Sequence, residues 1–271
     1  MLRTLISLAL MFPALAYAQM RVDGTRLVVT DASGREADGA QLEGAELDLG
    51  ELGTLRITQN RLDPEARFPD ELWLLQGQMR RPGATEFSAL CPADTKGDTR
   101  MLIFSGYLDP GLRYVADPSR FSMSCVSGVE AKCLRWGYLP WRKAPAGEVS
   151  LAPYFESCIR MARADYCGND QPTTRDGTAI DVYDRIGIQQ RTPNLSDYAF
   201  EAGWAPHGAV CVHHARIPEN LALELLPARC PRLTGKVLGS ACDETAAESL
   251  GALIMQRSIQ RGTPDLAIRP I

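Results

Sequence analysis

Short apolar runs separated by turn residues fill the chain up to about residue 116. Residues 26–30 and 101–104 are typical of these runs, and the Asp-Ala-Ser-Gly sequence at residues 31–34 is typical of the turns. Apolar runs of about four to eight residues between Gly, Pro and Asp clusters indicate strands. The pattern therefore predicts a β-rich first half, folded as an antiparallel sandwich or a small barrel.

The spacing of apolar residues becomes helical after residue 150. Intervals of three and four residues between positions 155 and 166 predict a central helix with one buried face. Pro153 suits the first turn of this helix, and Gly168 suits the left-handed position after its end. We expect Arg160 and Arg163 on its wetter side. The buried face would consist of Phe155, Cys158, Ile159, Ala162 and Tyr166.

Strand patterns return beyond the central helix. Residues 178–184 are typical of a strand, and residues 200–204 and 209–214 flank a turn at 205–208, which predicts a hairpin. The predicted fold class is therefore α+β. A β-rich half comes first, and a second half with one central helix and a C-terminal helix follows.

The C-terminal helix is predicted from about residue 245 to residue 261. Thr245 and Glu248 have the spacing of a capping box, which marks a helix start. Leu250, Leu253 and Ile254 would form its buried face. Gly262 and Pro264 would stop the helix, because neither residue favours a helical interior.

Residues 1–18 have the pattern of a secretory signal peptide. One arginine precedes an apolar run, and the Ala-Tyr-Ala sequence at residues 16–18 provides the small residues of a cleavage site. The run is shorter than the roughly 20 apolar residues that a spanning helix needs. We expect cleavage between Ala18 and Gln19, export to the periplasm or the extracellular space, and no membrane span.

The formal net charge of −4 at pH 7 is small and is spread without long blocks of like charge. Nucleic-acid and anionic-membrane binders usually present a basic surface. The composition therefore argues against nucleic acid or a membrane surface as the main partner. A glycan, a cell-envelope component or another exported protein fits an exported chain better.

The chain has eight cysteines, an even number that indicates disulfides in an oxidising compartment. A helix over residues 158–166 would separate Cys158 from Cys167 by roughly 13 Å at 1.5 Å per residue, whereas bridged Cα atoms lie within about 7 Å. Each should therefore bond elsewhere. Cys230 and Cys242 enclose a short loop and are the favoured pair, and the remaining connectivity is left open. The cysteines are Cys91, Cys125, Cys133, Cys158, Cys167, Cys211, Cys230 and Cys242.

The second half resembles the ADYC-domain family, whose name matches the tetrapeptide Ala-Asp-Tyr-Cys at residues 164–167. Further segments that are similar to the family lie at residues 125–141, 177–184 and 200–204. The resemblance implies an exported, disulfide-stapled α+β domain and no particular activity. The resulting organisation is a signal peptide at 1–18, a β-rich region at 19–116, an ADYC-type domain at 117–232 and a helical extension at 233–271.

Cysteine and metal chemistry are weakly indicated. Cys167 would lie at a helix C-terminus, where the dipole opposes a thiolate. The histidines are His207, His213 and His214, and the last two would point to opposite faces of a strand, so they could not hold one ion together. We expect no cofactor. A calcium site built from acids between residues 169 and 184 is the alternative to aspartates that cap turns.

Two classes of function remain. A glycosidase-like hydrolase would use a pair of carboxylates, for which Asp165, Asp176, Asp181 and Glu201 are the candidates, although Arg163 beside Asp165 favours a structural ion pair. A binding protein would use aromatic faces, and core packing beneath the bridge at Cys133 is the alternative role for the same rings. We favour non-catalytic recognition. The ligand-binding candidates are Trp136, Tyr138 and Trp141.

Overall fold

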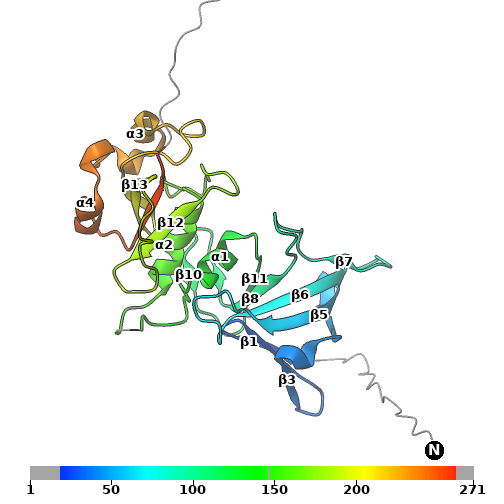
Figure 1. The fold of residues 1–271 in the computed structure, drawn as a ribbon. Helices are drawn as coiled ribbons and strands as arrows, with labels where there is room; N and C mark the ends of the chain where they lie inside the picture. Colours follow the sequence, from blue (N-terminus) through cyan, green and yellow to red (C-terminus); the bar gives the residue numbers. More distant parts are fainter. Residues whose placement is uncertain (1–18, 146, 261–271) are drawn as a thin grey trace, which may run out of the picture.

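The computed structural model describes residues 19–145 and 147–260. The predicted signal peptide and cleavage site therefore lie largely outside the described residues, and Gln19 begins the first strand. Figure 1 shows two strand-rich lobes, an N-terminal lobe (residues 19–125) and a C-terminal lobe (residues 163–260), with two helices from the segment that joins them lying between them. No helix within these residues is long and apolar enough to cross a membrane.

Two open antiparallel sheets form most of the N-terminal lobe, which is the sandwich form of the predicted β-rich half. A three-stranded sheet, in the order β1-β2-β3, packs on a six-stranded sheet in the order β11-β8-β6-β5-β4, with β7 pairing to β6. A separate β9–β10 pair lies beside them. The strands are β1 (Gln19–Asp23), β2 (Arg26–Thr30), β3 (Glu36–Asp38), β4 (Glu46–Asp48), β5 (Thr54–Leu62), β6 (Trp73–Arg80), β7 (Ser88–Ala89), β8 (Met101–Ser105), β9 (Tyr107–Leu108), β10 (Tyr114–Val115) and β11 (Phe121–Cys125).

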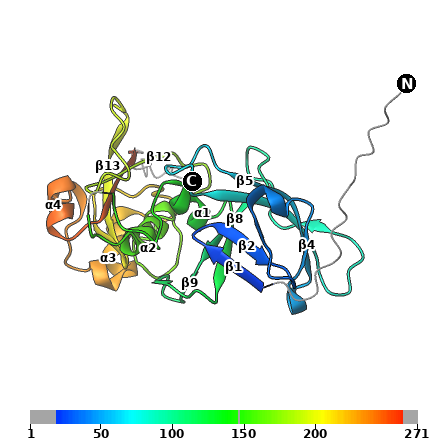
Figure 2. The same cartoon turned by 90° about the horizontal axis from the view of Figure 1, so that it is seen from below.

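The apolar run of β8 is continuous rather than alternating because both faces of this strand are buried. Met101 and Ile103 face the core between the two sheets, whereas Leu102 and Phe104 face the helices on the other side. Successive side chains of a strand point to opposite faces, so both sets are buried. The helices are α1 (Val129–Arg135) and α2 (Ala152–Ala162), and Figure 2 shows them between the lobes.

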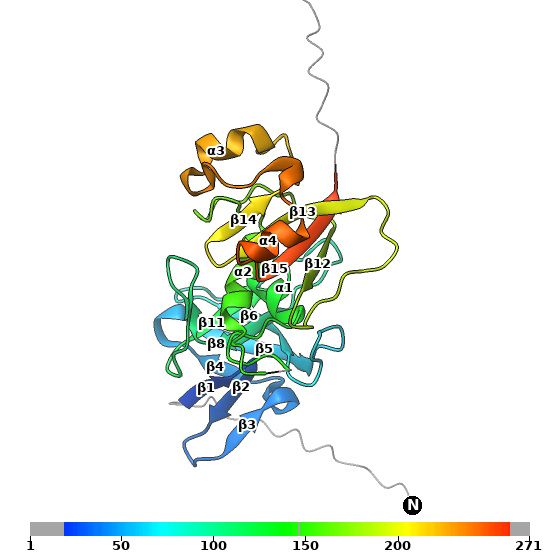
Figure 3. The same cartoon turned by 90° about the vertical axis from the view of Figure 1, so that its left-hand side faces the viewer.

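The C-terminal lobe is built on a four-stranded antiparallel sheet in the order β12-β15-β13-β14. Helix α2 packs on one face, where Trp204 lies in the main core. On the other face α4 (Glu244–Ser249) approaches Gly203, where an added Cβ would lie 2.6 Å from that of Ala247. Figure 3 shows this sheet with α3 (Leu226–Arg229) beyond it. The strands are β12 (Ile180–Asp184), β13 (Tyr198–Ala205), β14 (Gly208–Val212) and β15 (Ile254–Ile259).

The predicted strand after the central helix and the predicted hairpin are both confirmed, as β12 and as the β13–β14 pair. The helix predicted over residues 245–261 is wrong, because α4 ends at Ser249 and the chain continues into β15. Asp243 caps α4 by accepting a hydrogen bond from the Ala246 N–H at 2.7 Å. Leu250 is 38% exposed, whereas Ile254 is buried as a strand residue. Pairing with β12 and β13 outweighs the local helical pattern.

Helix α2 starts as predicted, with Pro153 in its first turn, but it ends four residues earlier than expected. Ala164 takes the left-handed conformation (φ +51°), and the Asp165 N–H donates to the Arg160 carbonyl at 2.9 Å. Residues 164–168 therefore form a turn. The expectation that Arg160 lies on the wetter side is wrong, because its side chain is 4% exposed and is held by polar partners.

All eight cysteines form disulfides. Cys158 and Cys167 bond elsewhere, as the helical spacing requires. The favoured pair of Cys230 with Cys242 is wrong, because two 3-10 turns in the intervening loop direct these residues to different partners. Cys230 faces the turn after α2, and Cys242 faces β14. The bridges are Cys91–Cys125, Cys133–Cys158, Cys167–Cys230 and Cys211–Cys242.

Candidate functional site

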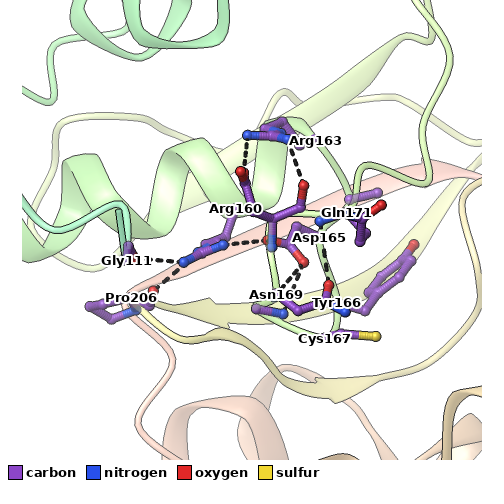
Figure 4. Close-up of polar contacts among 12 residues, drawn as sticks. Gly111, Arg160, Arg163, Asp165, Tyr166, Cys167, Asn169, Gln171 and Pro206 are labelled. Carbon is purple, nitrogen blue, oxygen red and sulfur yellow. Dashed lines mark hydrogen bonds and ion pairs between the residues drawn. The ribbon is translucent and has the colours of Figure 1, made fainter. Parts of the chain in front are cut away.

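The carboxylate of Asp165 organises the turn that follows α2. It accepts hydrogen bonds from the backbone N–H groups of Gly168 (2.9 Å), Asn169 (3.2 Å) and Asp170 (2.9 Å). It also pairs with the buried guanidinium of Arg160, as Figure 4 shows. Asp165 is fully buried, so its carboxylate serves as a turn cap and ion-pair partner without access to solvent.

The charged neighbours of Asp165 differ from those expected. Arg163 pairs with Asp170 rather than with Asp165, so the predicted partner is wrong although a structural ion pair is present. Arg160 also donates to the Gly111 carbonyl at 2.7 Å, which joins α2 to the turn between β9 and β10. The guanidinium geometry allows one arginine to bind several oxygens at once.

A second buried polar cluster surrounds Glu201 on β13. Its carboxylate accepts a hydrogen bond from the Tyr166 hydroxyl at 2.8 Å and pairs with the Arg216 guanidinium at 3.1 Å. The Tyr166 ring stacks on Trp204, with centroids 5.2 Å apart. The hydroxyl oxygen of Tyr166 also accepts a hydrogen bond from the backbone N–H of Arg216 at 2.9 Å. The cluster therefore ties the turn after α2 to the sheet.

The ionisation of this cluster follows from its contacts. Burial alone would raise the pKa of Glu201, but the Arg216 charge and hydrogen bonds from Arg216, Ser258 and Gln256 outweigh it and lower that pKa. Burial, and then the Glu201 charge, raise the pKa of Tyr166 well above its usual value. Glu201 is therefore a carboxylate and Tyr166 a neutral phenol over the physiological range.

The other two acid candidates lie in different surroundings. Asp181 on β12 is 5% exposed and accepts from the Arg257 Nε at 2.9 Å and from the Thr192 N–H at 3.1 Å. Asp176 is exposed in the turn before β12. The structure thus gives Asp165 and Asp181 separate arginine partners, and it leaves Asp176 at the surface.

The three aromatic candidates also separate. Tyr138 is fully buried, donates to the Asp184 carboxylate at 2.9 Å and stacks on Tyr154. Trp141 is half-buried and lies against the β1–β2 turn, where a Cβ on Gly24 would be 3.1 Å from its Nε1. Trp136 lines an open pocket.

An open pocket of about 200 Å³ lies beside Trp136, and we call it the Trp136 pocket. Helix α1 and the residue after its end provide most of its wall, and the loop after β5 and the residue after β11 provide the rest. The half-buried Trp136 side chain packs against the main core. The lining residues are Glu65, Val126, Lys132, Arg135 and Trp136.

The position of Trp136 is held through its backbone. Its N–H donates to the Lys132 carbonyl at 3.0 Å, and its own carbonyl accepts from the Gln189 Nε2 at 2.5 Å. Gly137 follows with φ +100°, and an added Cβ there would lie 2.8 Å from the Cγ of Arg67. The backbone that carries the indole is therefore held on both sides of Trp136.

The two cationic side chains of the Trp136 pocket differ in whether they have an ion-pair partner. Arg135 donates to the buried Asp63 at 2.6 Å and to Glu65 at 2.9 Å. Lys132 is exposed, and it makes no ion pair with any residue that the structure describes. The pocket therefore offers an ammonium group and an indole to solvent.

Sequence reasoning missed Lys132 and Glu65 as pocket residues. Lys132 stands four positions before Trp136, so helical spacing could have placed both on one side of α1. Glu65 is 71 positions before Trp136 in the chain. Its approach depends on the loop after β5, which the Arg135 carbonyl holds by accepting from the Arg67 N–H at 2.8 Å. A tertiary contact of this kind has no signal in the sequence.

His213 and His214 have structural partners. His213 Nδ1 lies 3.0 Å from the Cys242 carbonyl, and His214 Nε2 lies 3.0 Å from the Ser258 hydroxyl. Within residues 19–145 and 147–260, no three His, Cys, Asp or Glu side chains gather in a way that could hold a metal ion. A cysteine nucleophile needs a free thiol, and every cysteine of this chain is in a bridge.

Open antiparallel sheets, two helices packed between them and four bridges define a disulfide-stabilised α+β protein. The family model for the ADYC domain matches residues 39–218, and the chain belongs to this family. The match includes much of the N-terminal lobe as well as the turn after α2. Searches of curated proteins and of solved structures return no match to the chain.

Proposed function

We propose that the protein is an exported binding protein without catalytic activity, and that its ligand site is the Trp136 pocket. The observation that carries this proposal is the exposed Lys132 ammonium beside a half-buried indole, without an ion-pair partner among the described residues. Pockets that combine apolar contact with a few directed polar groups are typical of ligand sites.

The alternative, a glycosidase-like hydrolase, receives less support from the geometry. A glycosidase needs two carboxylates about 5–10 Å apart, both able to reach the substrate. Asp165 and Asp181 are buried in ion pairs with Arg160 and Arg257, so neither is free to meet a sugar. Glu201 is buried as well, so Asp176 is the one exposed acid among the four candidates.

Export is part of the proposal. Four disulfides fit an oxidising compartment, and the sequence pattern of residues 1–18 fits a signal peptide. Expression of the full chain in a bacterial host tests this directly. The intact mass of the purified product should correspond to a chain that begins at Gln19. A reduced product that keeps residues 1–18 would contradict the proposal.

Ligand screening tests the site. The mature protein is screened by thermal shift against envelope glycans, peptidoglycan fragments and peptides, and each hit is titrated. Trp136→Ala should abolish binding of the hits, whereas Trp141→Ala, which removes a second half-buried indole, should retain it. Near-ultraviolet circular dichroism of both variants establishes that they fold. Equal binding by the wild type and Trp136→Ala, or turnover of a labelled glycan, would refute the proposal.

A further inference from the structure

We infer that the Trp136 pocket binds an acidic sugar, with the sugar ring on the indole and its carboxylate at Lys132. This inference rests on the proposed function and specifies the ligand for that same pocket. It follows from three features of the pocket: the unpaired ammonium group of Lys132, the volume of the pocket, and the carboxylate of Glu65 at its rim.

Lys132 is the cation of the pocket without an ion-pair partner among the described residues. Arg135 is shared between the carboxylates of Asp63 and Glu65 through three hydrogen bonds, so its guanidinium is not available to a ligand. Lys132 has no such partner in the described part of the chain. Its ammonium group is therefore the charge available to a ligand, and a carboxylate is the group that complements it.

The space suits one ring. The pocket measures about 200 Å³, below the roughly 300–1,000 Å³ of sites that enclose drug-sized ligands. Its apolar contact comes from the face of Trp136 with Val126 beside it. A rigid pyranose ring presents a flat C–H face to such an indole and loses little conformational entropy on binding.

The rim favours a sugar over an acidic peptide. Glu65 is exposed, and one of its oxygens accepts from Arg135 at 2.9 Å, which leaves the other oxygen able to accept. Sugar hydroxyls can donate to that carboxylate while the sugar acid faces Lys132. An acidic peptide would place further negative side chains against Glu65, and like charges at this range repel.

The experiment compares acids with neutral analogues of the same skeleton. The methyl glycosides of galacturonate, glucuronate and mannuronate, and N-acetylmuramate, each with one ring and one carboxylate, are titrated at low salt, each beside its methyl ester, and tetraglutamate provides the acidic peptide. At least one acid should bind about two- to fivefold more tightly than its ester, the range for an exposed ion pair. Added salt should remove this preference, because the pair is exposed.

Substitutions test whether Lys132 binds the carboxylate of the sugar. Lys132→Gln should reduce the affinity for the acid to that for the ester and leave the ester unchanged. Lys236→Gln removes an exposed lysine of the C-terminal lobe and should change neither affinity. Trp136→Ala should abolish binding of both compounds.

Three outcomes would overturn the inference: no acid binds at millimolar concentration, an ester binds as well as its acid, or tetraglutamate binds more tightly than every sugar. Failure of the inference stays distinguishable from failure of the proposed function. If neutral sugars or peptides bind the wild type and Trp136→Ala abolishes that binding, the pocket is a ligand site and only its acidic specificity is wrong. If bound compounds are insensitive to Trp136→Ala, the proposed function fails as well.

Discussion

Buried carboxylates in the C-terminal lobe each face one arginine. Taking two charges out of water is costly, and the pair is stable only when further hydrogen bonds satisfy both groups. The structure meets this condition with backbone N–H and carbonyl groups around each pair. Removal of one partner should therefore cost far more than loss of a surface pair. The pairs are Asp165 with Arg160, Asp181 with Arg257, and Glu201 with Arg216.

Asp165→Asn should destabilise the protein by about 3–5 kcal/mol, because Arg160 would stay buried without its counter-charge and the turn cap would weaken. The matched control is Asp170→Asn, which removes the more exposed partner of Arg163 and should cost less than about 1 kcal/mol. Urea unfolding measures both free energies. Equal losses of unfolding free energy in the two variants would show that the buried Asp165–Arg160 pair stabilises the protein no more than the exposed pair does.

Glu201 should make stability depend on pH. Its pKa is lower in the folded protein than the unfolded value of about 4.3, so its contribution is fully present above that value and is lost as the pH falls through the folded pKa. The free energy of unfolding of wild type minus that of Glu201→Gln should be constant near neutral pH and shrink towards pH 3. Urea titrations across that range measure it. A difference that grew on acidification would contradict the assignment.

At the level of elements, the turn after α2 and the β13–β14 hairpin depend on each other. Gly168 sits beside the hairpin tip, where an added Cβ would lie 1.7 Å from the His207 carbonyl oxygen. The disulfide from Cys167 to Cys230 then fixes the same turn to the residue after α3. The ADYC tetrapeptide is thus a structural junction, and each of its last three residues has a partner outside the helix.

Gly168→Ala should be strongly destabilising, by about 3 kcal/mol or more, because a left-handed backbone and a clash with a carbonyl coincide there. Gly177→Ala is the matched control. Gly177 has a similar φ of +79°, but no atom lies within 4 Å of its added Cβ, so only the backbone cost of about 1–2 kcal/mol applies. Thermal and urea unfolding compare the two. Similar losses would mean that the hairpin tip yields to the methyl group.

Across the whole molecule, local pattern was enough to predict most of the longer strands, the β13–β14 hairpin and the start of α2, since their signals lie within a few residues. Strand β15 was missed because Ile254–Ser258 are buried on both faces in the middle of a sheet, which removes the alternation that marks a strand. The Trp136 pocket was only partly predicted, because Glu65 reaches it through a loop. Disulfide pairing depends on distances that the sequence does not contain.

The disulfide connectivity can be checked with one substitution. Cys242→Ala should leave the thiol of Cys211 free and cost about 3–4 kcal/mol, because a bridge that spans 31 residues is lost. Alkylation of the unreduced, denatured variant, followed by peptide mass spectrometry, should label Cys211. Cys230→Ala, the matched control, should label Cys167 instead. Labelling of Cys230 in the Cys242→Ala variant would contradict the structure.

The contact between α2 and the β9–β10 turn has a consequence for preparing fragments. Glu156 accepts from the Tyr114 N–H at 2.9 Å, and Arg160 donates to the Gly111 carbonyl at 2.7 Å. A recombinant fragment that begins at residue 117 would lack Gly111 and Tyr114. Glu156 and Arg160 of α2 would then lose these hydrogen bonds, and the apolar side chains that pack against the N-terminal lobe would be exposed. Co-expression of the complementary halves, rather than either half alone, is the sensible route to split versions of this protein.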